Sequence, residues 1–207
     1  MLMDKKCVIV GAGDFSASDM PDINGFDLLI AADGGYENLL NCGHTPDVFI
    51  GDLDSLDEKP DGIETLILPK IKDDTDTMAA VKLGLQRGYG EFVILGGLGG
   101  KRFSHTIANL QTLAFLKKNN ACGTLISGKT EVRYLTPVDK AEFTHGSGFF
   151  SVFAANGKAV LDISGAKYSK QGVEVTGDFP LGVSTEFLPG TTVIKVLSGE
   201  IYLIIEK

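Results

Sequence analysis

The sequence predicts an α/β domain followed by an all-β domain. Up to about residue 130, short and fully apolar runs alternate with helical patterns, which is typical of a mainly parallel sheet covered on both faces. After Glu131 the helical periodicity stops, and short runs rich in β-branched and aromatic residues follow. Such runs predict a β-sandwich or small barrel. We therefore expect an α/β domain over residues 1–130 and a β-sandwich over residues 131–207, with the boundary within 127–137.

In the first part, the expected strands are 7–10, 26–32, 48–50, 66–68, 92–95 and 125–126. The expected helices are 36–41, 75–87 and 105–118. Met78, Val81 and Leu85 lie near one face of the second helix, and Gly88 is its stop signal. In the second part, the expected strands are 149–153, 159–163, 172–175, 191–197 and 201–205.

Composition narrows the possible functions. The formal net charge of −8 argues against a broad nucleic-acid surface. The three cysteines are far apart, which suits reduced thiols in the cytoplasm better than disulfides. The start of the chain lacks an apolar region long enough for a leader, and no apolar stretch approaches the length of a membrane span. We expect a cytoplasmic protein without nucleic-acid or membrane partners.

Two clusters of carboxylates follow apolar runs: Gly51-Asp52-Leu53-Asp54-Ser55 and Asp73-Asp74-Thr75-Asp76. Crowded carboxylates repel one another unless a cation lies between them. Mg²⁺ binds through one or two carboxylates together with substrate phosphates. Aspartate, serine and threonine also mark turns and helix starts, and this alternative would suffice for one cluster. Two clusters after strands in one chain favour metal and phosphate chemistry.

A glycine-rich segment, Gly96-Gly97-Leu98-Gly99-Gly100, precedes Lys101 and Arg102 and lies between a buried strand and the clearest helix. Glycines let the backbone approach a ligand, and a helix N-terminus attracts phosphate. The segment is not a Walker A loop, because Leu95 stands where that motif needs glycine. The alternative is a solvated connector. We expect Ser104 to cap the helix and His105 to lie in its first turn, as a neutral ligand-binding or structural histidine.

The opening Val8-Ile9-Val10-Gly11-Ala12-Gly13-Asp14 resembles the start of a dinucleotide fingerprint. Its third glycine is replaced by Ser16, and Asp19, Pro21 and Gly25 interrupt any helix that the fingerprint needs. A turn or a phosphate-facing loop is the preferred interpretation.

Four motifs in order resemble the thiamine pyrophosphokinase family: Ala32-Asp33-Gly34-Gly35, the two acidic clusters, and the segment 97–109. The resemblance continues through 164–168 and 182–186 and so covers nearly the whole chain. It implies an α/β catalytic domain, a C-terminal β-sandwich and a homodimer with active sites at the subunit interface. It also implies transfer of pyrophosphate from ATP to thiamine, giving thiamine diphosphate and AMP. A carboxylate near the alcohol could accept its proton, and the sequence does not choose among Asp52, Asp54 and Asp76.

The resemblance also implies roles for individual residues. Mg²⁺ would be held by Asp52, Asp54 and Asp76, with Asp73 beside them. ATP would be bound by Asp33, Gly34, Gly35, Gly99, Gly100, Lys101, Arg102, His105 and Asn109. Thiamine would face Ser184 and Thr185.

Two residues depart from the family pattern. Ser104 stands where the family usually has aspartate, and Thr185 stands where it commonly has asparagine. Ser104 loses a carboxylate, which favours the alternative of a non-catalytic thiamine or nucleotide sensor. Thr185 loses an amide, which favours the alternative of a pyrophosphokinase for another alcohol.

Overall fold

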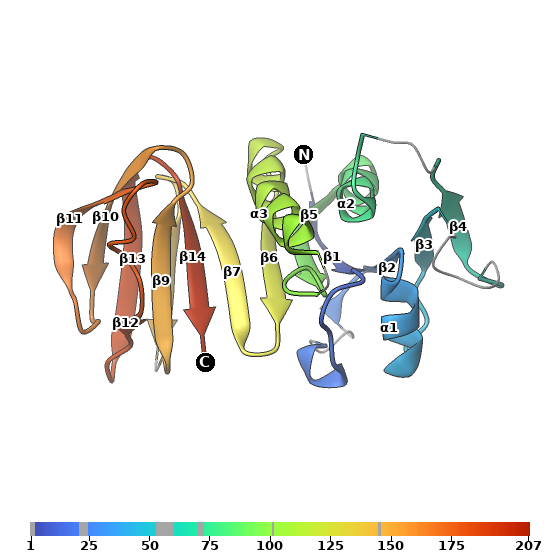
Figure 1. Ribbon diagram of the computed structural model, residues 1–207, viewed down its shortest axis with the longest axis horizontal. Helices are drawn as coiled ribbons and strands as arrows, with labels where there is room; N and C mark the ends of the chain where they lie inside the picture. The colour runs from blue at the N-terminus through green and yellow to red at the C-terminus, as the bar shows by residue number, and fades with distance from the viewer. Residues whose placement is uncertain (1–2, 21–24, 53–59, 70–72, 101, 145) are drawn as a thin grey trace. The chain divides into compact units, whose positions relative to one another are not determined.

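The computed structural model describes residues 3–20, 25–52, 60–69, 73–100, 102–144 and 146–207. The chain consists of two compact units, Met1–Gly128 and Lys129–Lys207. Each unit is built differently, the first from strands and helices and the second from strands (Figure 1).

The first unit contains a parallel sheet whose strand order is β6-β5-β1-β2-β3-β4. Each pair of neighbours in this order is parallel, which confirms the arrangement expected from the apolar runs. The strands are β1 (Met3–Val10), β2 (Leu28–Ala32), β3 (Val48–Gly51), β4 (Glu64–Ile67), β5 (Tyr89–Leu95) and β6 (Cys122–Ser127).

Helices cover both faces of this sheet. On one face, Leu39 of α1 (Gly35–Asn41) joins Val8, Val10 and Phe49 in a buried cluster. On the other face, α2 (Asp76–Gln86) lies so close to the sheet that a Cβ on Gly84 would be 2.5 Å from the Phe92 ring. Successive residues of a strand point to opposite faces. The third helix, α3 (Phe103–Lys118), packs along β6.

Two helix boundaries bear on the predicted site. The prediction that Ser104 caps α3 is wrong, because the helix begins at Phe103 and Arg102 occupies the capping position without a side-chain cap bond. The chain leaves the loop in an extended conformation at Arg102, with φ −121° and ψ 100°, so the first helical residue comes one position before Ser104. After β1, a single turn of 3₁₀ helix, Ala17–Asp19, stands where a dinucleotide fold would need a long helix.

The second unit contains two antiparallel sheets that share one hydrophobic core. In one, the strands β12-β9-β14-β7 pair in this order as part of a ten-stranded sheet, and the other is a separate four-stranded sheet of order β11-β10-β13-β8. The strands are β7 (Thr130–Leu135), β8 (Lys140–Thr144), β9 (Phe149–Ala154), β10 (Lys158–Ser164), β11 (Lys170–Thr176), β12 (Thr185–Glu186), β13 (Thr191–Ser198) and β14 (Ile201–Glu206). The sequence did not predict β7, β8 and β12, which are rich in charged residues or very short.

Within the part of the chain that the structure describes, no helix is long and apolar enough to cross a membrane.

Candidate active site

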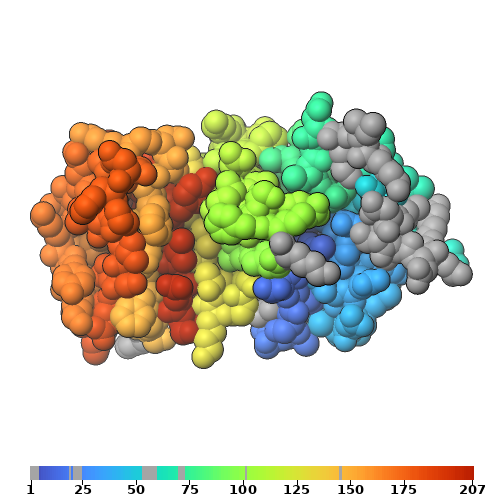
Figure 2. Space-filling view, viewed as in Figure 1, coloured from blue at the N-terminus to red at the C-terminus, as the bar shows by residue number. Residues whose placement is uncertain are grey.

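The loops that carry the predicted residues of the first unit lie at one edge of its sheet. Neighbouring parallel strands β5, β1, β2 and β3 end at the same edge, so the loops that follow them lie side by side. This edge receives the glycine-rich loop after β5, the loop 11–14 after β1, Asp33 after β2 and Asp52 after β3. Phe103 and Ile107 at the start of α3 are exposed, and Figure 2 shows this part of the chain, coloured green, at the surface.

The loops after β1 and β5 are bound to each other through their backbones. The Gly11 N–H donates to the Leu95 carbonyl at 2.8 Å, and the Gly13 N–H donates to the Gly96 carbonyl at 2.9 Å. A Cβ on Gly13 would lie 2.5 Å from the Gly96 oxygen, so only glycine permits this approach. The glycines that resemble a dinucleotide fingerprint therefore pack one loop against the other.

Two amide side chains, one from α1 and one from α3, donate hydrogen bonds to the backbone of these two loops. Asn38 of α1 donates from Nδ2 to the carbonyls of Gly11, at 2.9 Å, and Gly13, at 3.3 Å. Asn109 of α3 is 6% exposed and donates from Nδ2 to the Gly97 carbonyl at 2.7 Å. The structure thus gives Asn109, a predicted ATP contact, a supporting position behind the loop. Sequence reasoning missed Asn38, which belongs to no motif.

The tip of the glycine-rich loop has a backbone that favours glycine. Gly99 and Gly100 have φ of +68° and +79°. The Gly100 N–H donates to Oδ2 of Asp14 at 3.2 Å, and the Thr106 hydroxyl donates to the Gly99 carbonyl at 3.4 Å. Lys101 lies outside the described residues. Arg102 is exposed, and His105 is partly buried in the first turn of α3, as predicted.

Asp33 combines a strained backbone with an unsatisfied side chain. Its φ is +51°, a conformation that residues other than glycine rarely adopt. Its N–H donates to the Ile50 carbonyl at 2.9 Å, but its buried Oδ1 has no hydrogen-bond partner among the residues that the structure describes. A buried polar atom of this kind calls for an explanation, such as a missing ligand.

The two glycines after Asp33 have a structural reason of their own. A Cβ on Gly35 would lie 1.8 Å from the Val10 carbonyl oxygen, so the start of α1 passes directly over the end of β1. A Cβ on Gly34 would lie 3.0 Å from Cβ of Ala12. Contact of these glycines with ATP stays a prediction.

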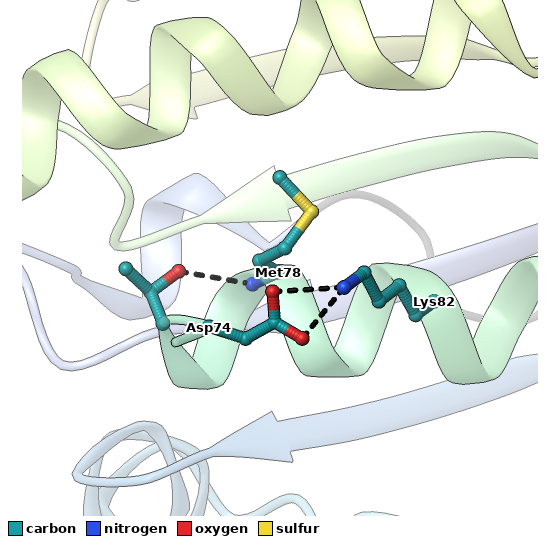
Figure 3. A network of polar contacts seen from close by, with 4 residues as sticks. Asp74, Met78 and Lys82 are labelled. Atoms are coloured by element: carbon teal, nitrogen blue, oxygen red, sulfur yellow. Dashed lines mark hydrogen bonds and ion pairs between the residues drawn. The ribbon is translucent and has the colours of Figure 1, made fainter. Parts of the chain in front are cut away.

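The aspartates of the two acidic clusters differ in their exposure and in their partners. Asp52 and Asp76 are partly buried, Asp73 is exposed, and Asp54 lies outside the described residues. The carboxylate of Asp74 accepts two hydrogen bonds from Nζ of Lys82, at 2.8 and 2.6 Å (Figure 3). Asp74, which the resemblance gives no metal role, is thereby paired with a cation of the helix that follows it, α2.

The second cluster also starts α2. The Thr75 hydroxyl accepts from the Met78 N–H at 3.1 Å and so caps the helix. Asp76 is the first helical residue, where the helix dipole favours a negative charge. The cap therefore fixes the point at which the chain of the second acidic cluster, residues 73–76, passes from the loop into α2.

The described carboxylates suit a metal that is bound together with phosphate. No group of three or more histidine, cysteine, aspartate or glutamate side chains that could hold a metal occurs within the described part of the chain. Mg²⁺ does not need such a group, because one or two carboxylates and the substrate phosphates suffice. The donor chemistry of Asp52, Asp73 and Asp76 therefore fits Mg²⁺.

The predicted thiamine residues belong to the second unit. Ser184 is exposed, has a φ of +56°, and its N–H donates to the Ser151 hydroxyl at 3.0 Å. Thr185 is 5% exposed in β12, opposite Phe150 of β9. Ser184 therefore presents its side chain at the surface, whereas Thr185 does not. Their contact with thiamine stays a prediction.

The motif 164–168 meets the motif 182–186 through an ion pair. Nζ of Lys167 donates to Oε2 of Glu186 at 2.7 Å, and this hydrogen bond raises the pKa of Lys167. The Lys167 N–H also donates to the Glu186 carbonyl at 3.1 Å. Two segments that the family resemblance singled out thus form one surface of the second unit.

A parallel sheet with acidic and glycine-rich loops at its carboxyl edge is typical of α/β proteins that bind phosphate groups. The family model described as "Thiamin pyrophosphokinase, catalytic domain" matches residues 23–123. This match confirms the family resemblance seen in the ordered motifs.

Solved structures of similar fold cover nearly the whole chain. A thiamine pyrophosphokinase from Bacillus subtilis has a TM-score of 0.84 and 23% identity, over 98% of this chain and 99% of that one. A thiamin pyrophosphokinase family protein from Enterococcus faecalis has a TM-score of 0.84 and 22% identity, over 98% and 99%. The yeast thiamin pyrophosphokinase has a TM-score of 0.79 and 15% identity, over 98% and 86%. These likenesses show the fold. A search among curated proteins found no match.

Proposed function

We propose that this chain transfers the pyrophosphate group of ATP to the hydroxyethyl oxygen of thiamine, giving thiamine diphosphate and AMP. The match of residues 23–123 to the thiamin pyrophosphokinase catalytic domain carries the proposal. The geometry supports it, because Asp52, Asp33 and the glycine-rich loop follow strands of one parallel sheet that all end at the same edge.

The reaction needs positioning and charge neutralisation more than covalent help from the protein. The thiamine oxygen attacks the β-phosphorus of ATP, the bond from that phosphorus to the bridging oxygen on the α-phosphate breaks, and AMP leaves with that oxygen. The proton of the alcohol passes to a carboxylate, for which Asp52, Asp54 and Asp76 are the candidates. The proposal assigns ATP binding to Asp33, Gly34, Gly35, Gly99, Gly100, Lys101, Arg102, His105 and Asn109.

Each part of the loop would contribute differently. The exposed guanidinium of Arg102 stands at the start of α3 and can grip phosphate with two parallel hydrogen bonds. Glycine backbone at Gly99 and Gly100 leaves room for a phosphate to approach. Asn109 acts through the loop, because its amide already holds the Gly97 carbonyl.

Mg²⁺ is the proposed cofactor, held by Asp52, Asp54, Asp73 and Asp76. When bound, the ion would neutralise the charge of the ATP phosphates. The buried Oδ1 of Asp33, which has no partner among the described residues, marks a further anionic oxygen beside the first acidic cluster. Thr75 and Lys82 set the position of the second cluster by capping α2 and pairing with Asp74.

The finer proposals concern assembly and location. Thiamine would bind at Ser184 and Thr185, and the protein would act as a cytoplasmic homodimer whose active sites lie at the subunit interface. The second unit leaves several large apolar side chains exposed, which favours a covered surface there: Phe149, Phe179, Leu181 and Val183.

The test is the identity of the products. Purified protein incubated with thiamine and Mg·ATP should give thiamine diphosphate and AMP in equal amounts, resolved by liquid chromatography and mass spectrometry. Thiamine monophosphate with ADP would overturn the proposal. Binding of both substrates without turnover over hours would indicate a sensor. Faster turnover of another alcohol than of thiamine, in a panel at matched concentrations, would indicate a different acceptor.

A further inference from the structure

We propose that the Asp14 carboxylate is an internal stand-in for phosphate on the glycine-rich loop, which the incoming ATP phosphate must displace. This inference rests on the proposed function, because it concerns the same loop. It concerns Asp14, which ends the opening motif but receives no role from it or from the family resemblance, and it gives that residue a role in binding affinity.

The carboxylate lies directly on the tip of the loop. Oδ2 of Asp14 accepts a hydrogen bond from the Gly100 N–H at 3.2 Å. A Cβ on Gly99 would lie 2.5 Å from the same oxygen, so the carboxylate is in contact with the Gly99 backbone as well. Both glycines have positive φ, which turns their backbone into a shape that glycine alone adopts easily. A backbone N–H that receives a carboxylate oxygen also suits a phosphate oxygen.

The backbone of Asp14 is fixed, whereas its side chain is exposed. The Ser127 hydroxyl donates to the Asp14 carbonyl at 3.3 Å, and the Gly13 N–H donates to the Gly96 carbonyl at 2.9 Å. Among the residues that the structure describes, Asp14 forms no salt bridge. The contact with Gly100 can therefore open by rotation of the side chain, without movement of the loop.

The charge of Asp14 opposes the binding of a second anion at the same place. A polyphosphate that takes the Gly100 N–H must displace the carboxylate and then remain near it, and both steps cost affinity. When ATP is absent, the carboxylate accepts the hydrogen bond of the Gly100 N–H and so keeps the loop in the conformation that binds phosphate. The residue therefore lowers affinity while it preserves the geometry of the empty loop.

Two substitutions separate this role from a purely structural one. Asp14→Asn keeps an oxygen that can accept from the Gly100 N–H but removes the charge, and Asp14→Ala removes both. We expect each variant to bind inorganic pyrophosphate about three- to tenfold more tightly than the wild type, the range that a partly exposed charge contributes. Calorimetric titration with pyrophosphate, without thiamine, measures this directly. Asp61→Asn is the control, since it removes the same charge from an exposed residue. Asp61 comes before β4 and so lies near the amino ends of the strands, whereas the glycine-rich loop lies at their carboxyl ends.

Every outcome decides the inference. An unchanged Asp14→Asn with a weakened Asp14→Ala would show that Asp14 only anchors the loop and would overturn the proposal. The proposal would also be overturned if both Asp14 variants bound pyrophosphate with the affinity of the wild type, or if Asp61→Asn gained as much affinity as they do. Failure of every protein to bind pyrophosphate would overturn it as well. Turnover of thiamine by the wild type is measured separately. Tighter binding in both Asp14 variants with an inactive wild type would sustain this inference and refute the proposed function. Unchanged binding in both variants, with a wild type that makes thiamine diphosphate, would refute this inference and sustain the proposed function.

Discussion

Single amide side chains set the position of the glycine-rich loop. Asn109 is 6% exposed, and its Nδ2 holds the Gly97 carbonyl at 2.7 Å. Asn38 holds the carbonyls of Gly11 and Gly13 in the neighbouring loop. These hydrogen bonds join neutral groups, so their loss should change the geometry of the loop and not its charge.

Asn109→Asp should destabilise the fold and weaken ATP binding. The carboxylate cannot donate to the Gly97 carbonyl, and an unsatisfied buried group costs about 1–3 kcal/mol in unfolding free energy. Because the loop would shift, we expect the KM for ATP to rise more than the KM for thiamine. Urea denaturation and steady-state kinetics measure the two effects. Gln111→Glu, an exposed amide-to-acid change in the same helix, is the control. Equal effects of the two changes would contradict the role of Asn109.

The two neighbouring acids Asp74 and Asp76 should respond differently to loss of charge. Asp76→Asn should lower kcat/KM by at least about a hundredfold, because charge stabilisation through a metal contributes several kcal/mol. Asp74→Asn should change it by less than about fivefold, since a partly exposed ion pair such as Asp74–Lys82 contributes only about 1 kcal/mol or less. Kinetics at saturating Mg²⁺ compares them. Wild-type rates in Asp76→Asn, or unfolding of that variant, would show that Asp76 is a structural helix residue.

At the scale of elements, the start of α2 links helix stability to the second acidic cluster. Thr75→Ala should lower the unfolding free energy by about 1 kcal/mol, because the cap on the Met78 N–H is lost. Thr75→Ser keeps the hydroxyl and should restore most of this loss. Thermal denaturation of both variants tests the prediction. A cost in Thr75→Ser as large as in Thr75→Ala would show that the methyl group, and not the cap, carries the effect.

The elements of the first unit could be predicted because each has a strong local signal. Apolar runs such as Val8–Val10 are buried on both sides in the sheet, and Gly88 follows the end of α2 as expected. β7 and β8 were missed because glutamate, arginine and lysine interrupt their apolar residues, and tertiary pairing outweighs this weak pattern. The cap of α3 was misplaced because the loop, and not a hydroxyl, decides where the helix begins.

The candidate site was predictable only in part. Motifs located the acidic clusters and the glycine-rich loop, but they do not show which groups hold that loop. Asn38 and Asp14 act from other elements, and only the fold brings them to the Gly11–Gly13 and Gly99–Gly100 backbones. Asn109 belonged to a motif, yet its side chain supports the backbone. Sequence spacing does not distinguish such support from contact with a ligand.

At the scale of the whole molecule, we expect a homodimer formed through the second unit. Its exposed apolar side chains, Phe149 among them at 46%, would be costly to leave in water. Sedimentation equilibrium at micromolar concentration should therefore give twice the mass of the chain. A monomer with full activity would refute both the dimer and the shared active site.

The most direct test of the central claim follows the phosphorus atoms of ATP. With thiamine and Mg²⁺, ATP labelled at the α-phosphate should give labelled AMP, and ATP labelled at the γ-phosphate should give labelled thiamine diphosphate. Both products should form at the same initial rate, because one pyrophosphate group moves in a single transfer. Labelled ADP from the α-labelled nucleotide, with thiamine monophosphate carrying the γ-label, would contradict the account.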